Sequence, residues 1–139
     1  MKAPSSVEKA YKQALIARKN AHAPYSKFKV GAALKLKGKD EVALGCNIEN
    51  ASFGATMCAE RTALFSAVAA NGSKIKPEFL VIVTAEEEAT VPCGLCLQAL
   101  AEFCPDKMDV YLGNEDGLLE KKKFSDFLPH AFRAFAKDS

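Results

Sequence analysis

The stretch Phe79-Leu80-Val81-Ile82-Val83 decides the fold class, because an unbroken run of apolar residues predicts a strand buried on both faces of a sheet. Helical patterns lie on either side of it, one over residues 56–70 and one from Pro92 to the stop at Cys104-Pro105. A further strand follows over residues 108–112. Strands that alternate with helices predict an α/β protein.

The N-terminal part of the chain predicts a helix followed by a hairpin. Ser5-x-x-Glu8 is a capping-box pattern, and the apolar spacing after it predicts a helix that runs to about Asn20. Apolar residues then alternate over residues 28–36 and again over 42–48, on either side of a Lys- and Gly-containing turn. We expect a hairpin with one buried face, and the alternation alone places Phe28 in its core.

The order of these elements makes a prediction about the sheet. Strands over 42–48, 79–83 and 108–112 are separated by the two predicted helices. Right-handed crossovers would make these strands parallel neighbours, and would place both helix N-termini near the carboxyl edge of the sheet, where open α/β folds bind ligands.

Length and composition predict one ordinary globular domain over residues 1–139. Hydrophobic residues make up 49% and charged residues 26%, with 8 Gly and 6 Pro, which excludes collagen-like, low-complexity and mostly disordered classes. No apolar run approaches the roughly 18 residues of a membrane-spanning helix, and no signal-type hydrophobic segment follows Met1. We therefore expect a cytoplasmic protein.

The net charge of +2 conceals an uneven distribution. Residues 1–40 carry +8, residues 41–118 carry −8 and the remainder carries +2. Lysines on the polar faces of a helix and a hairpin explain the basic segment as well as a nucleic-acid site does, so nucleic-acid binding is not the favoured hypothesis.

Cysteine is the informative residue type. An odd set of five without a secretion signal does not predict a disulfide framework. Cys58, Cys93 and Cys96 lie at the starts of the two predicted helices, and three thiols leave zinc one open position, the arrangement of catalytic rather than structural sites. Cys104 lies about 12 Å along the helix from Cys96 and is too far to share an ion. Cys46 remains open as a fourth ligand.

Two charged residues follow the first cysteine. Glu60 is placed to exchange protons between a metal-bound water and a substrate nitrogen, although a solvated glutamate in a first helical turn is the alternative. Arg61 is a permanent cation that would offset the excess negative charge of three thiolates on one zinc ion, with a surface ion pair as the alternative.

Cys58-Ala59-Glu60-Arg61 together with Pro92-Cys93-Gly94-Leu95-Cys96 resembles the zinc signature of the cytidine deaminase family. The resemblance extends to residues 23–33, 45–52 and 128–132. It implies a three-layer α/β/α fold with a mixed five-stranded sheet, and a homotetramer whose sites take residues from neighbouring subunits. The implied activity is zinc-dependent hydrolytic deamination of cytidine and deoxycytidine to uridine and deoxyuridine in pyrimidine salvage, with release of ammonia.

The resemblance also assigns roles to residues. Cys58, Cys93 and Cys96 would hold Zn²⁺, with Glu60 as the catalytic acid and base and Arg61 behind the ligands. Asn47 and Glu49 leave the same face of a strand, so they can hold one hydroxyl group as donor and acceptor, and in the family this pair binds the sugar. The substrate-binding set is completed by Phe28, which would stack on the pyrimidine, by the backbone at Ala59 and Cys93, and by Phe132, which would reach a neighbouring subunit's site.

Several positions depart from the family pattern, and alternatives stay open. Leu97 stands where Arg is common, Phe53 where Tyr is frequent, and His22 and His130 replace other residue types. The alternatives are a deaminase for another aminopyrimidine nucleoside such as blasticidin-S, a polynucleotide deaminase, a thiol oxidoreductase that uses Cys93 and Cys96, and a noncatalytic module with a structural zinc closed by Cys46.

Overall fold

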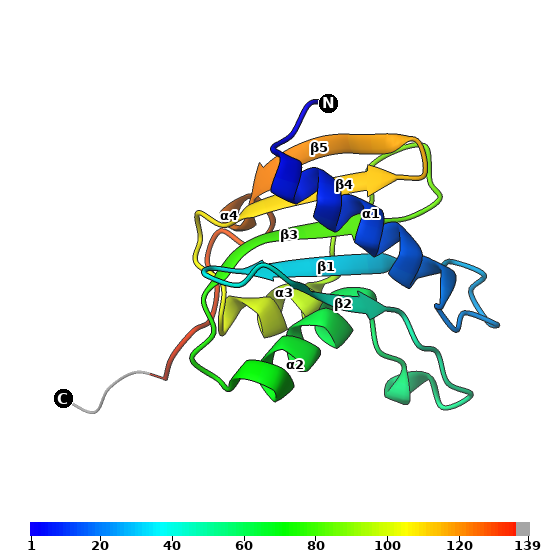
Figure 1. Ribbon diagram of the computed structural model, residues 1–139. Coiled ribbons are helices and arrows are strands. Elements are labelled where there is room, and N and C mark those ends of the chain that lie inside the picture. Colours follow the sequence, from blue (N-terminus) through cyan, green and yellow to red (C-terminus); the bar gives the residue numbers. More distant parts are fainter. Residues whose placement is uncertain (136–139) are drawn as a thin grey trace.

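The computed structural model describes residues 1–135, which form a five-stranded sheet covered by helices on both faces (Figure 1). The strand order is β2-β1-β3-β4-β5, with β3 and β4 parallel and the other neighbouring pairs antiparallel. The predicted mixed five-stranded sheet in a three-layer α/β/α arrangement is confirmed. The elements are α1 (Ser5–Lys19), β1 (Gly31–Leu36), β2 (Val42–Cys46), the short 3₁₀ turn η1 (Phe53–Ala55), α2 (Ala59–Asn71), β3 (Pro77–Val83), α3 (Gly94–Ala101), β4 (Asp109–Asn114), β5 (Gly117–Lys123) and α4 (Phe124–Phe127).

Two apolar cores lie on opposite faces of the sheet. Helix α1 packs through Val7, Tyr11 and Ala14 on one face, where Phe79 and Val81 of β3 meet it. Helices α2 and α3 cover the other face, which Leu80 and Ile82 of the same strand reach. Successive side chains of β3 therefore pack alternately into the two cores, as the unbroken apolar run of β3 predicts.

The prediction that the strands over 42–48 and 79–83 are neighbours was wrong. Strands β2 and β3 run in the same direction, but β1 lies between them and pairs antiparallel with both. Strand β1 is consequently interior and buried on both faces, not on one as the hairpin pattern predicted. The reason is that α1 covers one side of β1 while α2 covers the other, so the small residues Ala32 and Ala33 face different helices.

Helix starts also differ from the sequence predictions. The Ser5 capping box does not form: the carbonyl of Pro4 accepts from the backbone N–H groups of Val7 and Glu8, and no side-chain cap bond is made. Helix α2 begins at Ala59 rather than near residue 56, and α3 begins at Gly94 rather than at Pro92. Each of the latter two helices has a cysteine in extended conformation at its N-cap, which moves the start past the predicted residue.

The C-terminal aromatics divide into two groups. Phe124 is fully buried at the start of α4, and Phe127 packs partly against the same core. Phe132 and Phe135 do not pack into the protein: they are 59% and 87% exposed, in a segment without regular structure.

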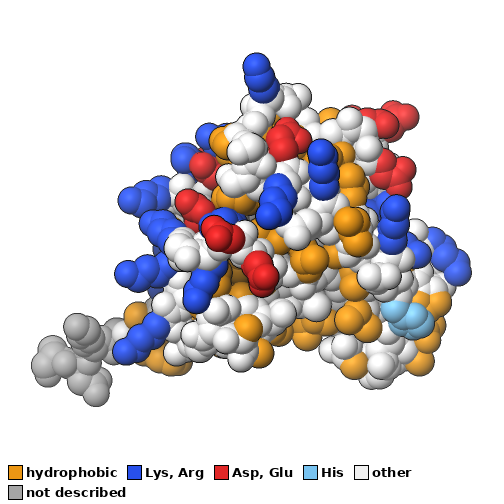
Figure 2. All heavy atoms as spheres, in the orientation of Figure 1, with side chains coloured by type: hydrophobic (Ala, Val, Ile, Leu, Met, Phe, Trp, Pro, Cys, Tyr) orange, Lys and Arg blue, Asp and Glu red, His pale blue; other side chains and the backbone are white. Residues whose placement is uncertain are grey.

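Lysines and arginines are dispersed over the face formed by α1 and the sheet edge, with acidic side chains between them (Figure 2). The basic N-terminal segment therefore does not present one uninterrupted basic patch on this face. Among the helices of residues 1–135, none has the length and apolar character that crossing a membrane requires.

Candidate functional site

The site lies where α2 and α3 begin, on adjacent helix N-termini. Cys58 is the N-cap of α2 and Cys93 the N-cap of α3, and their Sγ atoms are 3.9 Å apart. The Sγ atom of Cys96, one turn into α3, completes a group of three sulfurs that all lie within 4.8 Å of one another. Exposed backbone N–H groups at helix N-termini carry partial positive charge, which favours thiolates at these positions.

This group of thiols fits a zinc ion. Zinc binds sulfur at about 2.3 Å in tetrahedral sites, which corresponds to sulfur–sulfur distances of about 3.8 Å. The Cys58–Cys93 distance of 3.9 Å already matches this value. Neither Cys46 in β2 nor the buried Cys104 belongs to the group, so among residues 1–135 these three thiols make an open rather than a closed site.

Gly45 allows the first turn of α2 to approach β2. A Cβ atom at Gly45 would lie 2.2 Å from the carbonyl oxygen of Ala59 and 2.5 Å from the backbone nitrogen of Ala63. Only the absence of a side chain permits this contact. The position of Cys58 and Glu60, which flank Ala59, therefore depends on a glycine in the neighbouring strand.

Glu60 lies buried beside the thiols. The residue is 6% exposed, and the Oε2 atom of its side chain lies 3.6 Å from Cys96 Sγ. Burial raises the pKa of the Glu60 carboxyl group, and the negative charge of Cys58 raises it further. The solvated-glutamate alternative is thus excluded, because the carboxyl group faces the thiols instead of water.

Arg61 contacts the thiol group as the sequence predicted. Its Nη2 atom lies 3.5 Å from Cys58 Sγ. Hydrogen bonding from the Cys96 thiol, followed by that from Arg61, lowers the pKa of Cys58 well below its ordinary value, which favours the thiolate, the form that binds metals. Leu97, at the position where the family commonly has Arg, is 7% exposed and packs in the core between α2, α3 and the sheet.

Asn47 and Glu49 hold a neighbouring loop. The Oδ1 atom of Asn47 accepts from the Val30 N–H at 2.8 Å, and its Nδ2 atom donates to the Phe28 carbonyl at 2.7 Å. Glu49 accepts from the backbone N–H groups of Tyr25 and Ser26 at 2.9 and 3.1 Å, and from the Ser26 hydroxyl. These bonds lower the pKa of the Glu49 carboxyl group, with the Ser26 hydroxyl as the main cause.

A cavity of about 280 Å³ brings most of the predicted residues together. Phe28 lines it, so the ring lies in the cavity wall and the hairpin-core interpretation was wrong. The lining comprises Ser26, Phe28, Val30, Asn47, Glu49, Thr56, Cys58, Ala59, Glu60, Ile82, Thr90, Val91 and Cys93. Phe132 is not part of this wall within its own chain.

Several residues of this wall were not predicted from the sequence to line a site. Ser26 lies in a segment that resembles the family, but its hydroxyl was given no role. Thr90 and Val91, in the loop before Cys93, carry no local motif that would have marked them. Phe53 does not line this cavity: it is 74% exposed, and its ring meets that of Tyr25 edge-on with centroids 5.7 Å apart.

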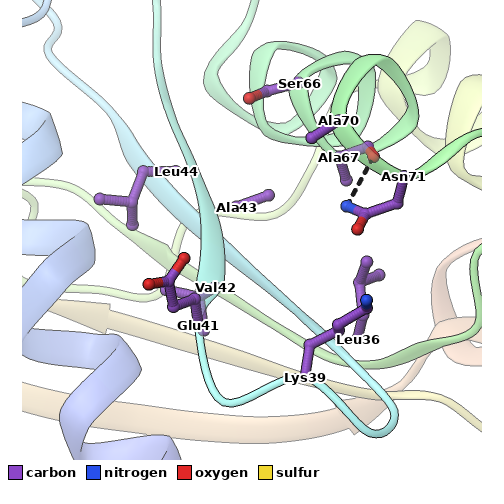
Figure 3. A pocket seen from close by; sticks show the side chains of 10 residues that line it. All are labelled: Leu36, Lys39, Glu41, Val42, Ala43, Leu44, Ser66, Ala67, Ala70 and Asn71. Carbon is purple, nitrogen blue, oxygen red and sulfur yellow. Dashed lines mark hydrogen bonds between the residues drawn. The ribbon is translucent and has the colours of Figure 1, made fainter.

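A second cavity, of about 410 Å³, lies between the β1–β2 hairpin and the C-terminal half of α2 (Figure 3). Lys39 and Glu41 are the charged residues among the described residues that line it, and the Asn71 side chain there bonds to the Ala67 carbonyl. Its wall contains no thiol and no histidine. This cavity is larger, but it lacks the groups that carry chemistry.

An open three-thiol zinc site with a buried carboxyl group beside it is the arrangement of zinc-dependent hydrolases. Residues 4–112 match the family model described as the cytidine and deoxycytidylate deaminase zinc-binding region. The chain belongs to this deaminase family and carries its zinc-binding region.

Named relatives agree with this assignment over most of the chain. A cytidine deaminase of Halalkalibacterium halodurans is 46% identical over 88% of this chain and 91% of its own length, and one of Sporosarcina psychrophila is 45% identical over 91% and 90%. Among solved structures, a cytidine deaminase of Burkholderia pseudomallei has a TM-score of 0.82 at 41% identity, covering 90% of this chain and 98% of that one. That of Mycobacterium tuberculosis has a TM-score of 0.79 at 30% identity, covering 94% and 100%.

Proposed function

We propose that this protein is a zinc-dependent cytidine deaminase that converts cytidine and deoxycytidine to uridine and deoxyuridine. One observation carries the proposal: the buried Glu60 carboxyl group lines a cavity together with Cys58, Cys93, Phe28, Asn47 and Glu49, and the thiol of the buried Cys96 converges with the other two behind this wall. The substrate is inferred from the names of the relatives given above. The cavity wall offers an aromatic ring for the base and polar side chains for the sugar.

Cys58, Cys93 and Cys96 would hold the zinc ion, whose role when bound is to lower the pKa of a water molecule. Hydrolysis forms a bond from water oxygen to C4 of the base, breaks the C4–N bond and releases ammonia. Glu60 takes one proton from the water and delivers it to N3, and it then passes the second proton, from the hydroxyl group added at C4, to the departing amino group, since its carboxyl group lies beside the ligand sulfurs. Arg61 offsets the thiolate charge through its contact with Cys58.

The remaining wall residues would bind the base and the sugar. The ring of Phe28 stacks on the pyrimidine, the backbone at Ala59 and Cys93 faces its polar edge, and Asn47 and Glu49 bind a sugar hydroxyl. Among residues 1–135, no Lys or Arg lines the cavity, and hydrogen bonds lower the pKa of the Glu49 carboxyl group, which favours its anion. A phosphate group would therefore be repelled rather than neutralised, which favours a nucleoside over a nucleotide or a polynucleotide.

We also propose that the chain, residues 1–139, acts as one deaminase domain in a cytoplasmic homotetramer. Its support is twofold. All five cysteines are free, which suits a reducing compartment. Phe132 projects into solvent at 59% exposure, as a residue that completes a neighbouring subunit's site would.

The test is to incubate the zinc-analysed protein with cytidine, deoxycytidine, cytosine and blasticidin-S, and to follow the ultraviolet change and ammonia release. Glu60→Gln should keep zinc and substrate binding and lose nearly all turnover. Glu102→Gln, an exposed carboxylate beyond α3, is the matched control and should behave as the unaltered protein.

Each contrary result is informative. Substantial turnover by Glu60→Gln would remove the role assigned to Glu60. Turnover of blasticidin-S alone, or none with one zinc ion bound, would direct attention to another amino-heterocycle. A protein without zinc whose thiols cycle through a disulfide would support the oxidoreductase hypothesis.

A further inference from the structure

The segment over residues 129–135 presents two aromatic rings to solvent. Phe132 and Phe135 are 59% and 87% exposed, and their rings meet edge-on with centroids 5.6 Å apart. The segment has no regular secondary structure, so no backbone ladder holds the rings in place. Their position must come from side-chain contacts with the rest of the fold.

Arg133 supplies most of these contacts. Its guanidinium donates from Nε to the Ala101 carbonyl at 2.9 Å, from Nη2 to the Cys104 carbonyl at 3.0 Å, and from Nη1 to the Asp106 carboxylate at 2.7 Å. It also lies 5.9 Å from the ring centroid of the buried Phe124. The Ala101 carbonyl belongs to the last residue of α3, where unpaired carbonyl groups carry partial negative charge, and the Cys104 carbonyl lies in the turn that follows the helix.

A second contact lies one residue earlier in the segment. Gln98, in the middle of α3, donates from Nε2 to the Phe132 carbonyl at 2.8 Å. The backbone at Phe132 and the side chain that follows it are thus both attached to α3. The same helix places Cys93 and Cys96 at its other end, so one rigid element connects the thiol site to the aromatic pair.

We infer that Arg133 is a positioning residue: it fixes Phe132 in the orientation with which that ring completes the substrate site of a second copy of this chain. This inference rests on the intersubunit role proposed above for Phe132. Without these hydrogen bonds, the irregular segment would lose conformational entropy when the Phe132 ring binds in the second copy. Hydrogen bonds that already hold the segment in the free chain remove part of that loss. Three donors in the planar fork of a guanidinium suit the three acceptors, and a lysine ammonium does not reproduce them.

The first test is a double-mutant cycle with Phe132→Ala, Arg133→Ala and the double variant, using steady-state kinetics with cytidine. We expect Arg133→Ala to raise KM about fivefold with kcat nearly unchanged, the effect of lost preorganisation. If Arg133 acts through Phe132, the double variant should be no worse than Phe132→Ala alone. Lys121→Ala, which removes another partly exposed cation from its pair with Asp109, is the control and should leave both constants unchanged.

A second readout does not depend on activity. Chymotryptic cleavage after Phe132 and Phe135, followed by mass spectrometry, should be faster in Arg133→Ala and Arg133→Lys than in the unaltered protein or Lys121→Ala. Zinc content, thermal midpoint and oligomeric mass are measured alongside, and Arg133→Gln, which retains part of the aliphatic stem and a single amide donor group, replaces Arg133→Ala if the latter folds poorly.

The outcomes separate this inference from the proposed function. Additive losses in the cycle, or Arg133 variants that match the unaltered protein in both assays, would overturn it. An Arg133 effect without a Phe132 effect would overturn it too, because the ring would not be the route. If the unaltered protein does not deaminate cytidine, the proposed function fails, and unchanged chymotryptic cleavage would then also refute attachment by Arg133.

Discussion

The Nδ2 atom of Asn47 donates a hydrogen bond to the carbonyl of Phe28 at 2.7 Å, and the Oδ1 atom of the same side chain accepts one from the N–H of Val30 at 2.8 Å. A residue predicted to bind the sugar therefore also determines the position of the ring predicted to bind the base. The two functions are joined because one short amide side chain, 8% exposed, bridges two adjacent backbone segments.

Asn47→Ala should accordingly reduce both stability and substrate affinity. It leaves the Val30 N–H and the Phe28 carbonyl without these partners, which should cost about 1–3 kcal/mol in the free energy of unfolding, and KM should rise. Asn71→Ala, which removes an exposed amide bonded to the Ala67 carbonyl, is the control. Urea unfolding and kinetics measure the two effects, and equal stability of the Asn47 and Asn71 variants would contradict the bridging role.

Gly45→Ala should disturb the thiol site from a distance. The new Cβ atom would lie 2.2 Å from the Ala59 carbonyl, so the first turn of α2 must move. Overpacking of this kind costs about 1–3 kcal/mol, and zinc affinity should fall with it. At Gly54 an added Cβ meets nothing within 4 Å, so Gly54→Ala should remain within about 0.5 kcal/mol of the unaltered protein. Normal zinc binding and stability in Gly45→Ala would show that the helix start does not depend on this contact.

Replacing any of the three grouped cysteines should remove the metal. Cys58→Ala, Cys93→Ala and Cys96→Ala should each weaken zinc binding by more than about 100-fold, beyond the range for residues that only support a ligand. Cys46→Ser should retain stoichiometric zinc, because Cys46 lies outside the group. Equilibrium dialysis with metal analysis measures both results. Loss of zinc from Cys46→Ser would restore the closed structural site as an explanation.

Stability should decrease at alkaline pH through Cys104. Burial raises the pKa of this thiol to about 12, whereas an unfolded cysteine titrates near its ordinary value of about 8.5. Between these values the unfolded chain releases a proton that the folded protein keeps, so rising pH favours unfolding, by at most about 1.4 kcal/mol per pH unit. Urea unfolding from pH 8 to 10.5 should show a steeper decline for the unaltered protein than for Cys104→Ala. Parallel curves would rule out this contribution, since buried tyrosines are common to both proteins.

The sequence by itself determined the local parts of this protein. The apolar run of β3 predicted a strand buried on both faces, because successive side chains of a strand point to opposite faces and here all of them are apolar. Cysteines at two helix starts, with Glu60 two residues after Cys58, predicted a three-thiol site with an acid beside it. Spacing of a few residues places Glu60 beside Cys58 and Cys96 one turn beyond Cys93, whereas the approach of Cys58 to Cys93, 35 residues further along the chain, belongs to the tertiary structure.

Only the tertiary structure decided how distant segments pair. No local pattern distinguishes an edge hairpin from one whose first strand inserts between β2 and β3, yet that insertion buries β1 on both faces and leaves Phe28 beyond the strand, in the cavity wall. Likewise, nothing near Asn47 in the sequence predicts its bonds to residues 28 and 30, or those of Arg133 to the end of α3. The physical reason is that periodicity specifies which face of an element is apolar, whereas the choice of neighbour follows from how helices on both sides of the sheet fill space together.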